Sequence, residues 1–554
     1  MTNNIVNENE NRNEIFINKM RENRRWFLGT SLIYGIIFAF CLYQNMSGIT
    51  FPVLTVVLLL FSRIYLNKAG IEIKKGTVWY ALGIMLLGLS TCLTANGFFH
   101  LFNSAGIILL YMKGMVHQLY DEGKWEFSDY VKNFFTMAGT WILSVRELFT
   151  SGSKDCGKKK ENEEIRVENL SEENGRKTGR LKGSKNLRQI MAGVVAAIIV
   201  LVIVFPMLLT SDRIFYELFD DLFEFLNPVK ILMRFDVGNL LGITFTILFG
   251  MVSIYTFFAG LFKKNLECGK KGEKNFRSVV SGITFTTVLT VVYVLYCGIQ
   301  VLFLFLRLDT GLPDGVTYSQ YAREGFWQLL FVSIINFLAV VICLRIFEKN
   351  KMLNTLLCMI SVCTCIMILS AGYRMMLYVA EYHLTFLRVL VLWFLAVLMI
   401  IFLGVMRCIF RRKFRLFQYI TVVISICYIG FSLIRPDCLI AEYNITHTEE
   451  MNENDLFYLM YGLSRDAAPV LSNIDLSDSE NLWMTTYLDD YFKSIESGRK
   501  TDWRTWNYSR VRAEQEAEEW MNKSNSSARA IRKTALRAYC GCRRCFTHRQ
   551  ALSS

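Results

Sequence analysis

Two neighbouring stretches near the middle of the chain decide the fold class. Residues 352–378 are MLNTLLCMISVCTCIMILSAGYRMMLY, and residues 384–405 are LTFLRVLVLWFLAVLMIIFLGV. Each stretch is long enough to cross about 30 Å of hydrocarbon as a helix. The only charged residues in them are Arg374 and Arg388. Because a helix satisfies its backbone polar groups internally, the two stretches predict a pair of membrane-spanning helices.

Similar apolar runs recur along most of the 554 residues, of which 53% are hydrophobic and only 6 are proline. We therefore predict an all-α integral membrane protein with about eleven transmembrane helices and a small C-terminal helical domain. The fourth predicted span is the weakest, because its apolar run is barely long enough to cross. The predicted spans are Trp26–Tyr43, Ile49–Tyr65, Val78–Leu93, Phe98–Met112, Ile190–Leu209, Val237–Phe262, Val279–Leu306, Phe326–Phe347, Met352–Tyr378, Leu384–Val405 and Leu416–Ile434.

The predicted spans divide the chain into five segments. Residues 1–112 hold the N-terminal tail and spans one to four, and 113–189 form a cytoplasmic amphipathic segment with a charged linker. Residues 190–434 hold the remaining spans, 435–525 an extracytoplasmic helical domain, and 526–554 a basic tail with cysteines. The aromatic residues early in 113–189 recur at helical spacing, which predicts a helix lying in the membrane interface.

Lysine and arginine are unevenly distributed between the loops. They cluster before the first predicted span and after the even-numbered spans, whereas the opposite loops are poor in basic residues. Basic residues near a span resist translocation, so we expect a multi-pass cell membrane protein with a cytoplasmic N-terminus and an extracytoplasmic C-terminus. This asymmetry explains the net charge of +13. We therefore expect the lipid bilayer as a partner and no nucleic acid.

Two groups of polar residues lie at span ends that this topology places on the outer side. We hypothesise that they hold an anionic lipid headgroup or an envelope glycan. The alternatives are an aromatic belt with a snorkelling arginine for the first group and a structural clamp for the second. The first group is Tyr318, Tyr321, Arg323 and Glu324, and the second is Arg374, Tyr378, Glu381 and Arg388.

Most of the 15 cysteines lie in predicted spans, where cysteine behaves as a small hydrophobic residue. A compact donor set near the C-terminus is the exception, and zinc binding is one reading of it. Unpaired or disulfide-linked tail cysteines are the alternative. The donor set is Cys540, Cys542, Cys545 and His548. The sequence contains no phosphate-binding glycine loop, paired-histidine metal helix or nucleophile elbow, so we expect no other cofactor and assign no catalytic residue.

Three stretches of the chain resemble a known family. They are TYSQYAREGF (317–326), SAGYRMMLYVAEYHLTFLR (370–388) and RPDCLIAEYN (435–444), the last continuing through Leu463–Pro469 and Asp502–Arg504. The stretches are similar to the polytopic bacterial membrane proteins catalogued as domain of unknown function 4173, which are related to the 4153 group.

The resemblance extends from about Asn96 to Ala513. The chain has His383 where the family usually has glycine, and Arg435 where asparagine is common. What the resemblance implies is a bacterial cell membrane protein of unknown activity, with fold and location but no chemistry assigned.

We interpret the sequence as that of a non-catalytic integral membrane protein, an envelope accessory or sensory component whose outer domain contacts an envelope protein. One alternative is a transporter, which would explain the charged residues at span ends. The other is a membrane transferase acting on a lipid-linked substrate. Its acid or base would come from Asp309, Asp314, Glu324 or Glu381.

Overall fold

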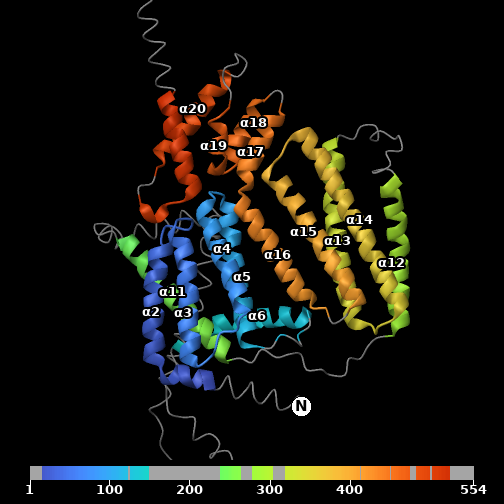
Figure 1. Ribbon diagram of the computed structural model, residues 1–554, viewed down its shortest axis with the longest axis horizontal. Helices are drawn as coiled ribbons and strands as arrows, with labels where there is room; N and C mark the ends of the chain where they lie inside the picture. The colour runs from blue at the N-terminus through green and yellow to red at the C-terminus, as the bar shows by residue number, and fades with distance from the viewer. Residues whose placement is uncertain are drawn as a thin grey trace, which may run out of the picture. The chain divides into compact units, whose positions relative to one another are not determined.

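The computed structural model describes residues 15–120, 122, 125, 127–148, 237–263, 278–302, 318–411, 414–448, 451–474, 482–499 and 502–523 (Figure 1). These residues form helices joined by turns and contain no β-strand. The chain is an all-α membrane protein, as its apolar runs predict.

Nine helices among the described residues are long and apolar enough to cross a membrane. They are α2 (Arg24–Leu42), α3 (Thr50–Ala69), α5 (Gly97–Leu119), α11 (Val237–Lys263), α12 (Val279–Gln300), α13 (Tyr318–Ile346), α14 (Lys351–Tyr382), α15 (Phe386–Phe410) and α16 (Leu416–Ile434). A shorter apolar helix, α4 (Thr77–Leu93), accompanies them. Ten of the predicted spans thus coincide with helices, and Ile190–Leu209 lies outside the described residues.

The fourth predicted span is longer than its apolar run. Helix α5 continues seven residues beyond Met112 and has 23 residues, whereas α4, the third predicted span, has only 17. Its mean hydropathy of 1.2 is still the lowest of the nine candidate spans among the described residues, so the fourth span is weak in apolar character but not in length. The extra residues include Lys113 and His117, whose charge or polarity interrupts the apolar pattern but not the helix. The amphipathic segment after the fourth span is helical, as expected, and forms α6 (Phe127–Leu143).

One compact unit comprises the described parts of 1–43, 61–72 and 135–266. Its main contact joins α2 and α11. Gly35 permits this close approach, because a Cβ atom there would lie 2.4 Å from the carbonyl oxygen of Ile247. Tyr65 is fully buried in the same unit, with its hydroxyl 2.6 Å from Ser31 Oγ and its ring 4.8 Å from that of Phe258.

The second compact unit comprises the described parts of 44–60, 73–134 and 267–554. Helix α16 packs against α4 and α15, α15 against α14, and α14 against α12 and α13 (Figure 1). Since lipid is as apolar as the side chains, close packing and hydrogen bonds hold such helices together. Asn336 links three of them, because its Nδ2 lies 2.9 Å from Thr364 Oγ1 and its Oδ1 accepts a 2.7 Å hydrogen bond from Tyr293.

The C-terminal part of this unit is a small helical domain, as predicted. It contains α17 (Pro436–His447), α18 (Glu453–Phe457), α19 (Ala468–Leu471), α20 (Leu482–Ser497) and a helix over residues 508–523. Arg435, with φ of 54°, makes the sharp turn from α16, and Pro436 then starts α17. The core consists of buried residues such as Leu459, Leu488 and Phe492. Each fully buried side chain of this size contributes roughly 1.5–3 kcal/mol.

Candidate functional site

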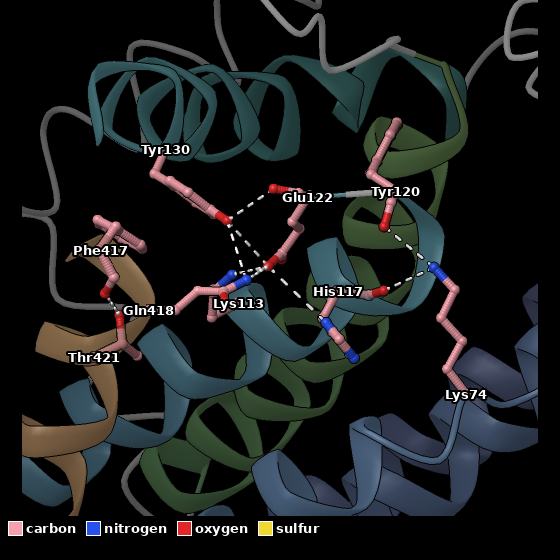
Figure 2. Close-up of polar contacts among 9 residues, drawn as sticks. All are labelled: Lys74, Lys113, His117, Tyr120, Glu122, Tyr130, Phe417, Gln418 and Thr421. Atoms are coloured by element: carbon pink, nitrogen blue, oxygen red, sulfur yellow. Dashed lines mark hydrogen bonds and ion pairs between the residues drawn. The ribbon is translucent and has the colours of Figure 1, made fainter. Parts of the chain in front are cut away.

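A buried carboxylate, Glu122, lies just beyond the end of α5, with only 3% of its side chain exposed (Figure 2). Lys113 of α5 places Nζ 2.5 Å from Glu122 Oε2. The same oxygen accepts hydrogen bonds from the Tyr130 hydroxyl of α6 at 3.2 Å and from Gln418 Nε2 of α16 at 3.1 Å. Glu122 Oε1 is buried and has no hydrogen-bond partner among the described residues. The carboxylate therefore joins three helices through one oxygen.

Aromatic rings surround this ion pair. Lys113 Nζ lies 4.4 Å from the centre of the Tyr130 ring, which stacks on Phe417 at 4.1 Å. Burial, followed by the charge of Glu122, raises the pKa of Tyr130, so its hydroxyl stays protonated and donates to the carboxylate. Figure 2 shows His117 one turn after Lys113, with Nδ1 3.9 Å from Glu122 Oε2. The name "Glu122 cluster" is used below for Lys113, His117, Glu122, Tyr130 and Gln418.

Lys74 fixes the end of α5 beside the Glu122 cluster. Its Nζ donates to the carbonyl oxygens of His117 at 3.0 Å and Tyr120 at 3.1 Å. Its backbone N–H donates to Gln118 Oε1 at 3.0 Å. The last carbonyl groups of a helix lack partners within the helix, and a lysine compensates both their hydrogen bonds and the helix dipole.

A second buried carboxylate, Asp466, lies in the short 3-10 turn η5 (Arg465–Ala467) of the C-terminal domain. Its Oδ2 accepts a 2.5 Å hydrogen bond from the Thr94 hydroxyl, and its Oδ1 accepts a 2.8 Å bond from the Ala95 N–H. Thr94 and Ala95 belong to the connection between α4 and α5. Asp466 thus attaches the C-terminal domain to the start of a span.

Asp437, in the first turn of α17, also attaches the C-terminal domain to the start of α5. Its Oδ2 accepts hydrogen bonds from Asn96 Nδ2 at 2.9 Å and from the Ser464 N–H at 3.0 Å. Asp437 Oδ1 is buried without a hydrogen-bond partner among the described residues. Burial, to which the charge of Asp466 adds, raises the pKa of Asp437 above its ordinary value of 3.8. The name "Asp437–Asp466 cluster" is used below for Thr94, Ala95, Asn96, Asp437, Ser464 and Asp466.

Local helix signals place these groups. Asn96 caps α5, because its Oδ1 accepts a 2.8 Å hydrogen bond from the Phe98 N–H while its amide nitrogen reaches Asp437. Ser464 precedes η5, and its Oγ accepts a hydrogen bond from the Asp466 N–H at 3.3 Å. Nearby, Asn507 Nδ2 lies within 3.3 Å of three carbonyl oxygens, those of Ser47, Thr91 and Thr94. The cap residues therefore serve both their own helix and the contact between domain and spans.

A further polar group, centred on Asn103, lies on α5 between the residues of the two clusters. Asn103 of α5 is fully buried and donates through Nδ2 to Thr91 Oγ1 of α4 at 3.1 Å. Its Oδ1 accepts hydrogen bonds from two residues of α16, Tyr428 at 2.9 Å and Ser432 at 3.2 Å. Helices α4, α5 and α16 are thus joined at an intermediate level.

The structure brings together only some of the site residues expected from sequence. Arg388 lies over the Tyr378 ring at 4.2 Å and donates to the carbonyl oxygens of Tyr382 and His383. Glu381 is exposed. The second group is therefore divided between a helix-end contact and a separate buried arginine.

That buried arginine is Arg374, whose side chain contacts α12. Its Nη2 donates to Gln300 Oε1 at 3.1 Å, and Ser370 Oγ donates to the same oxygen at 2.7 Å. Arg374 is 8% exposed and Gln300 9%.

The other expected residues lie outside the described side chains. Tyr318, Tyr321, Arg323 and Glu324 fall in the first turns of α13, and their side chains lie outside what the structure describes. Cys540, Cys542, Cys545 and His548 lie outside the described residues altogether. Within the described ranges no group of three or more histidine, cysteine, aspartate or glutamate side chains could hold a metal ion.

Sequence reasoning missed the principal members of both clusters. Lys113 directly follows an apolar run, and Glu122 lies in a polar segment, so neither signals burial. Asp437 and Asp466 lie within the third resemblance stretch and its continuation, which is the one sequence signal that marked them. Their pairing with residues 94–96 has no local signature.

Comparison with known proteins identifies the family but no characterised relative. The family described as domain of unknown function (DUF4153) matches residues 81–474, which include both clusters. No curated protein and no solved structure matches the chain. The 4173 family suggested by the sequence resemblance is not supported, whereas the related 4153 group is. This chain therefore belongs to the DUF4153 family of domains of unknown function.

Proposed function

We propose that this protein is a non-catalytic component of the cell envelope, accessory or sensory, in which a pair of spans couples the C-terminal helical domain to the opposite membrane side. One observation carries the proposal. The Asp437–Asp466 cluster and the Glu122 cluster hold opposite ends of the same antiparallel pair, α5 and α16.

The geometry of the pair supports coupling. Asn96 at the start of α5 and Lys113 near its end are separated by 17 residues, which is roughly 26 Å along a helix and close to the thickness of the hydrocarbon core. On α16, Gln418 belongs to the Glu122 cluster, and Asp437 follows the other end. A displacement at one cluster is therefore opposed at the other by buried hydrogen bonds, which are costly to break.

We further propose that the C-terminal domain is extracytoplasmic and contacts an envelope protein, and that the N-terminus is cytoplasmic. The support is the distribution of basic residues between predicted loops. Protease added to intact cells should remove an epitope tag placed at the C-terminus but not one placed at the N-terminus. Protection of the C-terminal tag until lysis would contradict this orientation.

Hydrogen exchange of the full chain in lipid nanodiscs tests the coupling. In a Lys113→Met variant, Glu122 loses its charged partner, and we expect amide exchange to rise in residues 436–474 as well as around Glu122. Tyr130→Phe is a milder variant, because it removes a neutral hydroxyl that donates to Glu122 and accepts from Gln418, and leaves the ion pair intact. Asn336→Leu is the matched control, because it breaks a buried polar link outside α5 and α16. Unchanged exchange in 436–474, or an equal rise in the control, would refute coupling.

Amide variants separate the non-catalytic proposal from the transporter and transferase alternatives. Asp437→Asn and Asp466→Asn keep an acceptor oxygen but abolish an ionisable carboxyl group. In a strain lacking the protein, we expect both variants to complement as the parent does. Loss of complementation with normal insertion would favour a carboxylate that reacts or carries protons.

A further inference from the structure

A short segment of the C-terminal domain, residues 502–509, lies against the ends of two spans. The Arg504 carbonyl oxygen accepts a 2.6 Å hydrogen bond from Asn45 Nδ2, shortly before α3. Asn507 Nδ2 lies 2.9 Å from the carbonyl oxygen of Thr94, shortly before α5. Both helices are long and apolar enough to cross a membrane. The 502–509 segment therefore lies at the level where spans leave the hydrocarbon core.

Large aromatic side chains of the 502–509 segment are exposed. Trp503 is 65% exposed, Trp506 40% and Tyr508 39%. Met46, which precedes α3, is 75% exposed. Tryptophan and tyrosine concentrate at membrane–water interfaces, because one end of the ring system is apolar and the other is polar. At the level of the span ends, the lipid interface is therefore the surface that suits these side chains.

Arg435 supplies a positive charge beside these rings. It follows the last residue of α16, and its guanidinium carbon lies 5.1 Å from the centre of the Tyr508 ring. The guanidinium group forms no hydrogen bond or ion pair within the described part of the chain. An arginine at the end of a span thus has an aromatic ring on one face and its donors unused.

The nearby carboxylates have other partners. Asp437 and Asp466 accept hydrogen bonds from neutral groups, as described above. Asp502, the carboxylate of the 502–509 segment, forms its ion pair with Arg504 at 2.8 Å. No contact with a described carboxylate therefore compensates the charge of Arg435.

We propose that Arg435 binds the headgroup phosphate of an anionic phospholipid, while Trp503 and Trp506 lie in the interface beside it. An arginine that stacks on an aromatic ring keeps its planar fork for phosphate, with which it forms strong charge-assisted hydrogen bonds. The level of the site selects lipid as the occupant, since headgroups surround each span where it leaves the core. The site requires no movement of either carboxylate cluster, so it does not rest on the proposed coupling.

Native mass spectrometry of the full chain tests the phosphate contact. The protein in detergent is given equal amounts of phosphatidylglycerol and phosphatidylcholine, whose cationic choline weakens its net attraction to an arginine. We expect the parent to retain more phosphatidylglycerol, and Arg435→Met to retain one such lipid fewer. Arg435→Lys keeps the charge without the planar fork, so its occupancy should be intermediate.

Lys493→Met is the matched control for this measurement. It removes one positive charge from an exposed position of α20, away from the 502–509 segment in sequence. We expect it to retain as many lipids as the parent. An unchanged lipid count in Arg435→Met, or the same loss in Lys493→Met, would overturn the proposed contact.

A soluble phosphate ester distinguishes a lipid from a free ligand. Glycerol 3-phosphate in large excess should leave the lipid that depends on Arg435 bound, because only the lipid also contacts the interfacial rings. Complete displacement would assign the site to a free phosphate ester and overturn lipid binding.

Fluorescence quenching tests the level of the rings without an arginine variant. Phosphatidylcholine brominated near the carbonyl end of its acyl chains quenches tryptophans that lie in the interface. In vesicles of this lipid, the emission that Trp503→Phe removes should be strongly quenched, and the emission that Trp483→Phe removes should not. Trp483 is the matched control, because it packs against the core of the C-terminal domain. Equal quenching of the two, or none of Trp503, would overturn the proposed placement.

Discussion

The Glu122 cluster and the Asp437–Asp466 cluster stabilise buried carboxylates with different partners. Both bury a carboxylate at an end of α5, and in both one oxygen lacks a hydrogen-bond partner among the described residues. Glu122 faces a lysine at 2.5 Å, so its charge is compensated by an ion pair. The hydrogen bonds to Asp437 and Asp466 come from neutral hydroxyl, amide and backbone groups. The first cluster should therefore respond to loss of charge, and the second to loss of hydrogen bonds and to pH.

The largest expected effect is that of Lys113→Met. Removing one member of a buried ion pair leaves an uncompensated charge, which costs about 3–5 kcal/mol. Lys113 is 10% exposed and Glu122 3%, so solvent screens the pair little. We expect a large fall in the thermal unfolding midpoint of the purified protein in detergent.

The double variant Lys113→Met with Glu122→Gln provides the control. It removes both charges together, and it should recover most of the lost stability because no unpaired buried charge remains. If the single and double variants are equally unstable, the ion pair does not account for the difference between the clusters.

A smaller effect is expected for Asp466→Ala. The substitution leaves the Thr94 hydroxyl and the Ala95 N–H without their acceptor, which costs about 1.5–3 kcal/mol for a hydrogen bond to a charged group. Limited proteolysis should show faster cleavage within residues 436–523. Asp466→Asn keeps one acceptor oxygen, so its cleavage rate should lie between those of the parent and the alanine variant. Unchanged cleavage in Asp466→Ala would mean that this contact does not hold the domain.

The smallest expected effect is a pH dependence at Asp437. Its pKa in the folded protein is raised, so the protonated form is favoured and its contribution to stability is fully present below about pH 3.8. That contribution is lost as the pH rises through the raised value. Relative to Asp437→Asn, the parent should lose about 1 °C of unfolding midpoint per kcal/mol lost over this range, because the unfolding entropy scales with the length of the chain. A constant difference between the two across pH would contradict the assignment.

Much of the fold follows from local sequence. Each predicted apolar run from Trp26 to Ile434 that the structure describes is a helix. A spanning helix forms all its backbone hydrogen bonds within itself, so it can be predicted without knowing which helices pack against it. The polar composition after Arg435 likewise predicted a helical domain, which has its own buried core. The length of α5 was underestimated, because Lys113 looks like the end of a span until its partner Glu122 is seen.

The candidate sites followed from sequence only in part. Arg374 was singled out as a charge within a span, and the structure places it against Gln300, which is 74 residues away. Arg388 and Tyr378 were expected together and are in contact. Glu122 was not singled out, because a carboxylate in a polar segment shows no sign of burial, and Asp466 was marked only by lying in the continuation of the third resemblance stretch.

The sequence by itself determined that this chain is a helical membrane protein with a distinct polar C-terminal domain. Hydrophobic length, helix caps and turn residues act over a few neighbouring positions, so they can be recognised without a fold. Only the tertiary structure decided which polar groups are buried and which residues are their hydrogen-bond or ion-pair partners. Asp466 meets Thr94 across 372 positions, and Gln418 meets Glu122 across 296. Such pairs form when helices pack and exclude solvent. The environment of a charge is then set by residues distant in sequence, so its neighbours in the sequence do not predict it.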